Sequence, residues 1–298
     1  MLVHKHTSPI MPARVVILGG GGFLVPEITR LLSLAAVPTR AIGSKTIDLT
    51  TPDAAKGLAG EILPSDAVVM AAALTPDKGR DIATLMKNLR MAESVCAALL
   101  RAKPAHLLYV SSDGVYDARF SSLLDEESTC EPADLYCLMH IARERMLQQT
   151  CRDAAIPLAI VRPCAIYGPG DTHNSYGPNR FVRAALKHGK ITLFGGGEEM
   201  RHHVYVTDVA EVIRLCLFHA STGVINALAD KAVSFAGVAE NIVHALGTNL
   251  PIETTPRTNP ITHRHFDTSA LVRAFPSFRA TSLDTGLKQT IEAMAGPS

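Results

Sequence analysis

The stretch Arg14-Val-Val-Ile-Leu-Gly-Gly-Gly-Gly-Phe-Leu24 decides the fold class of this 298-residue chain. An apolar run stops at four consecutive glycines, and helical spacing of apolar residues begins directly after them. A short apolar run that ends at turn residues is typical of a buried parallel strand. Glycines between such a strand and a helix let the backbone approach a pyrophosphate, whose charge the helix N-terminus favours. The stretch predicts a dinucleotide-binding turn, and the alternative is a turn that only permits tight packing.

Strand and helix patterns alternate along the first half of the chain. Strand-like runs lie at 39–42, 46–49, 66–73, 106–110 and 158–162, and helical spacing lies at 23–34, 53–63, 81–101 and 135–153. Such alternation predicts right-handed βαβ crossovers. We therefore expect an α/β fold with a Rossmann-type, doubly wound parallel sheet over residues 13–165, preceded by a flexible leader at 1–12.

The pattern changes after residue 163. Loops rich in glycine and proline surround one helical stretch at 180–187. Helices at 208–218 and 235–246 then flank a short strand at 224–227. Residues 166–298 are therefore predicted to form a smaller C-terminal α/β substrate-binding lid that is interleaved with the sheet.

The composition excludes several classes of function. With 29 basic and 28 acidic residues, the chain is not expected to bind nucleic acid by neutralising phosphates. No apolar run approaches the ~20 residues that span a membrane. Its six cysteines show no Cys-x-x-Cys spacing, and His4 with His6 offers too few ligands for a metal. We expect a cytoplasmic protein without a nucleic-acid, membrane or metal partner.

The segment that would face the cofactor ribose lacks an acidic residue. An NAD site usually places Asp or Glu about 20 residues after the glycines, where it accepts from the 2′-hydroxyl. Here the segment contains Ser44 and Lys45, which suit a 2′-phosphate and favour NADP. The alternative is a solvated turn. Asp48 is a candidate partner for the adenine amine.

A serine and a tyrosine stand where ligands meet such a sheet. Ser112 follows the predicted strand 106–110, so it should project at the carboxyl edge of the sheet. Tyr136 and His140 are four residues apart in a predicted helix and therefore share one face.

These motifs resemble the extended short-chain dehydrogenase/reductase family, which contains NAD(P)-dependent nucleotide-sugar epimerases, dehydratases and ketoreductases. The resemblance runs from Arg14 to about Met294. It is carried by the glycine turn, Asn88, Tyr136, and the segments 69–73, 110–112, 161–163, 167–169 and 201–208.

The resemblance implies a nicotinamide cofactor, NAD or NADP, and a set of site residues. It implies a homodimer formed by the helices near 80–101 and 135–153. The implied catalytic residues are Ser112, Tyr136 and His140. The implied cofactor-binding residues are Gly19, Gly20, Gly22, Phe23, Leu24, Ser44, Lys45, Asp48, Leu49, Ala71, Ala72, Ala73, Asn88, Tyr136, His140 and Pro163. The implied substrate-binding residues are Ser112, Asp113, Asn179 and Arg201.

His140 departs from the family pattern. In the family, the tyrosine exchanges a proton with the sugar, the serine hydrogen-bonds the same oxygen, and a lysine four residues after the tyrosine holds the nicotinamide ribose and favours tyrosinate. Three interpretations of His140 are open. It replaces the lysine as a working residue, it belongs to an enzyme with a different base or slow chemistry, or the chain has lost catalysis and kept only binding. If it is a substitute, the His140→Lys variant should be faster near neutral pH. Val25 also replaces the third glycine of the turn.

On the substrate side, Arg201 suits a pyrophosphate, since a guanidinium pairs bidentately with phosphate oxygens. Its alternative is an ion pair with Glu198 or Glu199. Asp208 is expected to cap a helix, and His202 with His203 is not expected to bind a metal.

The preferred interpretation is an epimerase or 4-ketoreductase of a nucleotide sugar. The alternative is a cofactor-binding sensor or scaffold with weak or lost catalysis. Further candidates are Arg180 for the nucleotide or sugar, and Tyr116 and Tyr167 for the sugar pocket.

Overall fold

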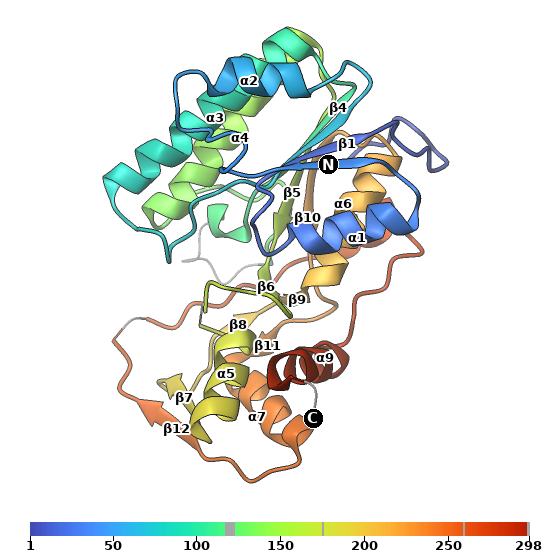
Figure 1. Cartoon of the computed structure of the whole chain (residues 1–298). Helices are drawn as coiled ribbons and strands as arrows, with labels where there is room; N and C mark the ends of the chain where they lie inside the picture. The colour runs from blue at the N-terminus through green and yellow to red at the C-terminus, as the bar shows by residue number, and fades with distance from the viewer. Residues whose placement is uncertain (117–122, 175, 259, 297–298) are drawn as a thin grey trace. The chain divides into compact units, whose positions relative to one another are not determined.

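The computed structural model describes residues 1–116, 123–174, 176–258 and 260–296 (Figure 1). The described residues divide into two compact units. The first comprises 1–116, 126–162 and 210–226, and the second comprises 123–125, 163–209 and 227–296. The chain therefore returns to the first unit after it has begun the second.

Six strands form the sheet of the first unit, and the Rossmann-type α/β fold is confirmed. Their order across the sheet is β2-β1-β3-β4-β5-β10. The pairs from β2 to β5 are parallel, with Val15 opposite both Thr39 and Ala67. The strands are β1 (Val15–Leu18), β2 (Thr39–Ile42), β3 (Ala67–Met70), β4 (His106–Val110), β5 (Leu158–Pro163) and β10 (Gly223–Ala227).

Helices cover both faces of this sheet because its central strands are apolar on both sides. Val16 and Leu18 face one core, shared with α2 (Ala54–Glu61), α3 (Ile82–Ala102) and α4 (Leu135–Ala154). The other face carries α1 (Val25–Leu34) and α6 (Val206–Phe218) (Figure 1). A short 3-10 helix, η1 (Asp113–Val115), follows β4.

The second unit is built from three strand pairs and four helices among its described residues. The pairs are β6 (Ala165–Tyr167) with β9 (His203–Tyr205), β7 (Ile191–Phe194) with β12 (Ile252–Thr255), and β8 (Met200–Arg201) with β11 (Val233–Ser234). The helices are α5 (Pro178–His188), α7 (Phe235–Leu246), α8 (Ser269–Ala274) and α9 (Leu283–Ala295).

One predicted strand is wrong. Residues 46–49 form turns instead, and their backbone bonds are local. The backbone nitrogens of Thr46 and Ile47 both donate to the Gly43 oxygen, at 2.9 and 3.0 Å. The Asp48 carboxylate accepts from the Thr50 backbone nitrogen at 2.9 Å. An aspartate that bonds the backbone two residues later stabilises a turn, and this local bonding replaces a ladder.

The expected leader is hydrogen-bonded to the first unit. Val3 exchanges two backbone bonds with Thr222, of 2.8 and 2.7 Å, and forms an antiparallel bridge with it. Ile10 donates to the Phe218 oxygen at 2.8 Å. Residues 3–10 therefore lie along the segment that leads into β10, where free backbone groups need partners.

No helix in the described part of the chain combines the length and the apolar character needed to cross a bilayer.

Candidate active site

The glycine turn joins β1 to α1 and closely approaches the segment after β3. Gly19 has a φ of +107°, and a Cβ there would lie 2.8 Å from the Ala72 backbone nitrogen. Only glycine permits this approach together with a positive φ. A Cβ on Gly21 would meet no atom within 4 Å, so the turn is open on that side. The rest of the turn is formed by Gly20, Gly22, Phe23 and Leu24.

The start of α1 adds donors to this open turn. Leu24 occupies the N-cap position and has no polar side chain with which to accept from the first-turn N–H groups. The Val25 N–H donates to the Gly22 oxygen at 3.3 Å and Pro26 has no N–H, so only part of the usual first-turn donor set remains for an outside acceptor. Val25 is 3% exposed and packs into the core, so the substitution of the third glycine leaves the turn open. The turn and the helix start together fit the pyrophosphate of a dinucleotide.

The predicted ribose segment lies in the turns after β2. Ser44 and Lys45 are exposed, whereas Leu49 is buried. The Asp48 carboxylate bonds both the backbone nitrogen and the hydroxyl of Thr50, and these bonds lower the pKa of Asp48. Asp48 therefore has a structural role within this turn. A preference for NADP stays a prediction.

Asn88 of α3 holds the segment that continues from β3. Its Oδ1 accepts from the Leu74 backbone nitrogen, and its Nδ2 donates to the Leu74 oxygen, both at 2.9 Å. The clamp fixes the backbone of 71–74, which contains the predicted cofactor residues Ala71, Ala72 and Ala73. Pro163, another predicted cofactor residue, ends β5 and is buried.

Ser112 lies between β4 and η1, close to the first turn of α4. Its Oγ accepts from the Gly114 backbone nitrogen at 3.1 Å, and Asp113 opens η1. A Cβ on Gly114 would lie 2.6 Å from Cys137 Sγ and 3.3 Å from Ser112 Oγ. Glycine at 114 therefore lets η1 lie against the helix turn that carries Tyr136. The structure thus places η1, which follows Ser112, against the first turn of α4. That Ser112 and Tyr136 share a substrate oxygen stays a prediction.

Tyr136 and His140 contact each other edge to face, with ring centroids 4.8 Å apart. His140 is 3% exposed, and its Nδ1 lies 2.8 Å from the hydroxyl of Tyr109 in β4. Burial and the nearby Arg143 guanidinium lower the pKa of His140 to about 3. Burial raises the pKa of Tyr136, and Arg143 opposes that rise. His140 is therefore a neutral imidazole at pH 7 and supplies no positive charge to the tyrosine.

Two residues of this cluster, Tyr109 and Arg143, are absent from the sequence-based site. Arg143 lies three residues after His140 and is fully buried. The spacing 136, 140, 143 places all three side chains on one helix face, and that signal is present in the sequence. It is easily missed, because an arginine in a polar helix usually lies on the solvated face.

Tyr116 belongs to a buried network rather than to a sugar pocket. Its hydroxyl donates to Asn226 Oδ1 at 2.8 Å and accepts from Arg162 at 2.9 Å. Arg162 also pairs bidentately with Glu144, at 2.9 and 2.7 Å, and Ser111 donates to the same carboxylate at 2.6 Å. The network ties β4, β5, β10 and α4 together inside the first unit.

The second unit contains an aromatic cavity of about 710 Å³. Arg201 lies in its wall, where it donates to the Thr262 backbone oxygen at 2.5 Å and to Thr262 Oγ1 at 3.0 Å. Glu198 and Glu199, the alternative ion-pair partners predicted for Arg201, form ion pairs with Arg257. The cavity is lined by Tyr176, Phe194, Glu199, Arg201, Phe235, Arg257, Thr258, Pro260, Ile261 and Thr262.

Asn179 and Arg180 lie in the first turn of α5. Asn179 is 4% exposed, its Oδ1 accepts from the Gly168 backbone nitrogen at 3.1 Å, and its Nδ2 has no partner among the described residues. A buried donor without a partner fits a ligand acceptor. Arg180 lies over the rings of Tyr176 and Phe194, 6.0 and 5.8 Å from their centroids.

The remaining predicted residues bind the protein itself. His202 Nδ1 lies 2.8 Å from the Ala229 oxygen, and His203 Nε2 lies 3.2 Å from the Val233 oxygen. Asp208 lies in the first turn of α6 and accepts from the backbone and side chain of Thr281, so it ties another segment to this helix start. Across the described ranges, no group of three or more His, Cys, Asp or Glu is placed to hold a metal ion. Tyr167 is buried against Tyr205.

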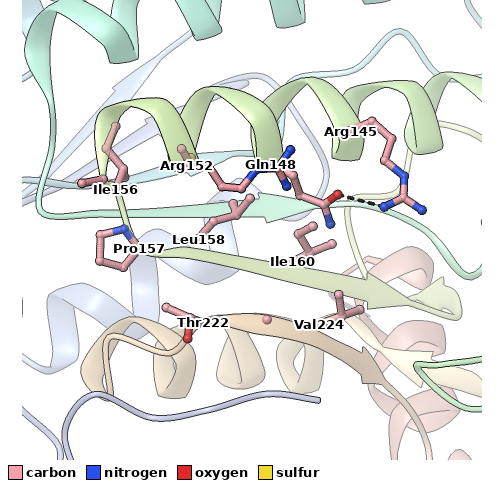
Figure 2. A pocket seen from close by; sticks show the side chains of 12 residues that line it. Arg145, Gln148, Arg152, Ile156, Pro157, Leu158, Ile160, Thr222 and Val224 are labelled. Carbon is pink, nitrogen blue, oxygen red and sulfur yellow. Dashed lines mark hydrogen bonds between the residues drawn. The ribbon is translucent and has the colours of Figure 1, made fainter.

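Figure 2 shows another cavity of the first unit, of about 700 Å³, between α4 and strands β5 and β10. Arg145, Gln148 and Arg152 of α4 form its polar side, and Leu158 and Ile160 of β5 contribute apolar side chains. Its described lining residues include none that the sequence placed in a site. The cavity and the tyrosine cluster are therefore separate features of this unit.

Comparisons with known proteins agree with this geometry. A family model, described as the NAD dependent epimerase/dehydratase family, matches residues 15–227. The dTDP-D-glucose 4,6-dehydratase of Homo sapiens is 28% identical over 127 residues, which is 43% of this chain and 36% of that protein. This chain thus matches about a third of the human protein's length.

Two further similarities extend over most of the chain. The dTDP-4-dehydrorhamnose reductase of Mycobacterium tuberculosis is 28% identical over 79% of this chain and 76% of that protein. The solved structure of UDP-glucose 4-epimerase from Thermus thermophilus, in complex with NAD, has a TM-score of 0.84 at 20% identity. That match covers 96% of this chain and 100% of the other, and it shows that the fold is shared.

Proposed function

Because the chain belongs to the NAD dependent epimerase/dehydratase family, we propose that it is an NAD(P)-dependent epimerase or 4-ketoreductase of a nucleotide sugar. The observation that carries the proposal is the cluster at the carboxyl end of β4, where Ser112 lies beside the helix turn of Tyr136 and His140. This cluster shares a unit with the open glycine turn, which supports a dinucleotide site and an acid–base pair in the same unit.

The residues of the first unit fit a nicotinamide cofactor. The open side of the glycine turn at Gly21, where a Cβ would meet no atom within 4 Å, and the start of α1 would hold the pyrophosphate. His140 Nε2 is buried without a partner among the described residues and would donate to a ribose hydroxyl. The cofactor, when bound, accepts or donates the hydride. Ser44 and Lys45 support NADP, and an NAD preference would contradict their proposed contact with a 2′-phosphate.

The acid–base chemistry falls to Tyr136 and Ser112. The Tyr136 phenol would exchange a proton with a hydroxyl or keto oxygen of the sugar. The Ser112 hydroxyl would hydrogen-bond the same oxygen and orient it, and Asp113 lies next in the chain. Positioned groups of this kind contribute typically 10²–10⁴-fold to a rate.

The second unit, taken by itself, carries groups that suit a nucleotide. Stacking on Tyr176, Phe194 or Phe235 suits a base, and Arg201 suits a diphosphate. The buried Nδ2 of Asn179 suits an uncharged ligand oxygen. An apolar carbonyl substrate would need neither of the last two groups.

We also propose a homodimer through α3 and α4. Ile82, Met86 and Leu100 of α3 and Leu138 of α4 are 69%, 44%, 48% and 42% exposed. Exposed apolar side chains on two adjacent helices are typical of an interface. A single species at twice the chain mass in light scattering would support the dimer, and a monomer would contradict it.

The test of function is binding and turnover with a panel of UDP-, GDP- and dTDP-sugars and with both nicotinamide cofactors. We expect calorimetric binding of one cofactor and a change in the reduced-nicotinamide absorbance with at least one sugar. Tyr136→Phe should reduce the rate by about 10²–10⁴-fold. Tyr205→Phe, a buried tyrosine of the second unit, is the matched control. Tight cofactor binding without turnover over the whole panel would instead favour the sensor or scaffold.

A further inference from the structure

Arg143 is a fully buried cation held by neutral acceptors. Its Nε and Nη2 donate to the Asn88 backbone oxygen at 2.9 and 2.6 Å, and its Nη1 donates to the Ala72 oxygen at 2.7 Å. Nη2 also reaches Asn88 Oδ1 at 2.9 Å. No carboxylate of the described residues is within hydrogen-bond distance of this guanidinium. Its donors are satisfied, but its charge is not neutralised.

An uncompensated buried charge is costly in free energy, so its presence calls for an explanation. The adjacent carboxylate, Glu144, pairs with Arg162 instead. The backbone oxygens that fix Arg143 come from the clamped segment after β3 and from α3. The guanidinium is therefore rigidly placed, and its positive charge is available to a group that becomes negative during function.

The group that becomes negative is on the same helix face. Tyr136, His140 and Arg143 are spaced by four and three residues, and Arg143 lowers the pKa of both Tyr136 and His140. A fixed cation favours a phenolate, and the charged form of a nearby imidazole is disfavoured. The same charge therefore adds to burial in keeping His140 neutral, and it opposes the rise that burial causes in the pKa of Tyr136.

We propose that Arg143 supplies the positive charge that stabilises the Tyr136 phenolate, while Tyr109 holds His140 as a neutral imidazole whose Nε2–H donates to a cofactor hydroxyl. The proposal rests on the proposed function. Two tasks that the family resemblance gives to one lysine are thus divided between a hydrogen-bond donor and a separate, permanently charged group. Arg143 and Tyr109 are positioning residues, since neither is required to touch the ligand.

The Tyr109 contact determines which nitrogen of His140 carries the proton. Arg143 opposes the effect of burial on the pKa of Tyr109, so the lone pairs of the phenol oxygen lie in the field of the guanidinium. The phenol proton then points to His140 Nδ1, 2.8 Å away, and the imidazole proton remains on Nε2. That Nε2–H is buried without a partner among the described residues, a state that is unfavourable until an acceptor binds.

The first experiment measures the charge effect without turnover. A fluorinated tyrosine in place of Tyr136 lowers the intrinsic pKa, so its ionisation can be followed by fluorine NMR while the protein is folded. Arg143→Met should raise the pKa of this group by roughly one to three units. Arg145→Met, an exposed arginine of the same helix, should leave that pKa unchanged. An unchanged pKa in Arg143→Met would overturn the assignment of the charge.

A second variant serves if Arg143→Met does not fold. Asn88→Asp keeps Arg143 and gives it a carboxylate, at the expense of the bond to the Leu74 oxygen. It should raise the pKa of the fluorinated tyrosine, and it should raise the pKa of His140 from about 3. If neither pKa moves although the variant is folded, the charge of Arg143 has no role at Tyr136.

The tautomer of His140 is read by nitrogen NMR of labelled histidine, with His140→Gln to assign the signal. We expect the Nε2–H form in the parent protein and a mixture of tautomers in Tyr109→Phe. The Nδ1–H form in the parent would overturn the Tyr109 part of the proposal. Because these spectra need no substrate, a protein that turns over no sugar would fail the proposed function and still give a result here.

If the protein turns over a sugar, the steady-state kinetics of the variants provide a further test of the role of Arg143. Arg143→Met should lower kcat more than it changes KM and move the alkaline rise of the pH–rate profile upward, whereas Arg143→Lys should retain most of kcat. His140→Lys should give no gain in rate, because a second cation would lie beside Arg143. A faster His140→Lys enzyme would show that the charge is missing from the parent and would contradict the proposal.

Discussion

Arg143 and Arg162 are two buried arginines at neighbouring positions around α4, and they differ in how their charges are satisfied. Arg162 is 5% exposed and forms a bidentate ion pair with Glu144. Arg143 is 0% exposed and, among the described residues, bonds only uncharged groups such as carbonyl oxygens and a thioether. Burial opposes both charges, but Glu144 more than offsets it and raises the pKa of Arg162, while the pKa of Arg143 is lowered. Arg162 is a structural crosslink between β5 and α4. The positive charge of Arg143, in contrast, is the one that we propose acts on Tyr136.

Glu144→Gln should have the largest effect, because it leaves Arg162 buried without its counter-charge. We expect the free energy of unfolding to fall by about 3–5 kcal/mol in urea titrations followed by circular dichroism. The double variant Glu144→Met with Arg162→Met should recover much of that loss, since an apolar pair replaces an ion pair. A single variant as stable as the parent would mean that Arg162, like Arg143, needs no carboxylate.

The next largest effect concerns the pH dependence of stability, to which Arg143 contributes through its neighbour His140. The pKa of His140 is about 3 in the folded chain and ordinarily about 6.5 in an unfolded one. Between these values the unfolded chain binds a proton that the folded chain excludes, so stability falls as the pH drops below about 6.5. The slope from one such histidine is about 1.4 kcal/mol per pH unit.

His140→Gln should remove this slope from urea titrations at a series of pH values. Arg143→Met should end the fall in stability at a higher pH, because Arg143 contributes with burial to the low folded-state pKa. His203, whose pKa is also lowered to about 3 mainly by burial in the second unit, provides the reference. His203→Gln should remove an equal slope that Arg143→Met leaves in place. If the parent shows no fall in stability between pH 6.5 and 5, neither histidine is buried in its neutral form.

Tyr116→Phe should weaken the Arg162 network by less than the loss of Glu144 does. The phenol bonds Arg162 and Asn226, and its removal leaves both partners buried. We expect a loss of about 1–3 kcal/mol, with the m-value of the urea transition unchanged. A loss above that of Glu144→Gln would place the centre of the network at the tyrosine instead of the carboxylate.

Arg145→Met should have the smallest effect of the series. Arg145 is exposed and bonds only Gln148, at 3.1 Å, among the contacts described for its side chain. Substitutions at such surface positions usually change stability by within about 0.5 kcal/mol. A larger change in the free energy of unfolding would show that α4 is destabilised by the loss of any of its arginines. The effects of Arg143 and Arg162 could then not be attributed to how their charges are satisfied.

The parallel sheet was predictable because its signals are local. Val15–Leu18, Ala67–Met70 and His106–Val110 are continuous apolar runs, and each ends at small or polar residues. β7 was missed because it has only four residues and its partner, β12, lies 61 positions later along the chain. Register between such distant, short strands is set by tertiary packing, which sequence patterns do not report.

The candidate site was predictable only where spacing carries the chemistry. Tyr136 and His140 share a helix face by their separation alone. That Arg257 binds Glu198 and Glu199, and so leaves Arg201 to Thr262, depends on a contact across about 60 residues. The burial of Arg143 is equally non-local, since its acceptors come from Ala72 and Asn88.

The bridge between Val3 and Thr222 has a consequence for how the protein behaves in concentrated solution. β10 is an outer strand of the six-stranded sheet, and an outer strand offers unpaired N–H and C=O groups to other chains. The first residues of the chain occupy backbone groups immediately before β10 and lie along that side. They pair with the segment that precedes the outer strand, so they reduce the length of free backbone next to this edge that another chain could pair with.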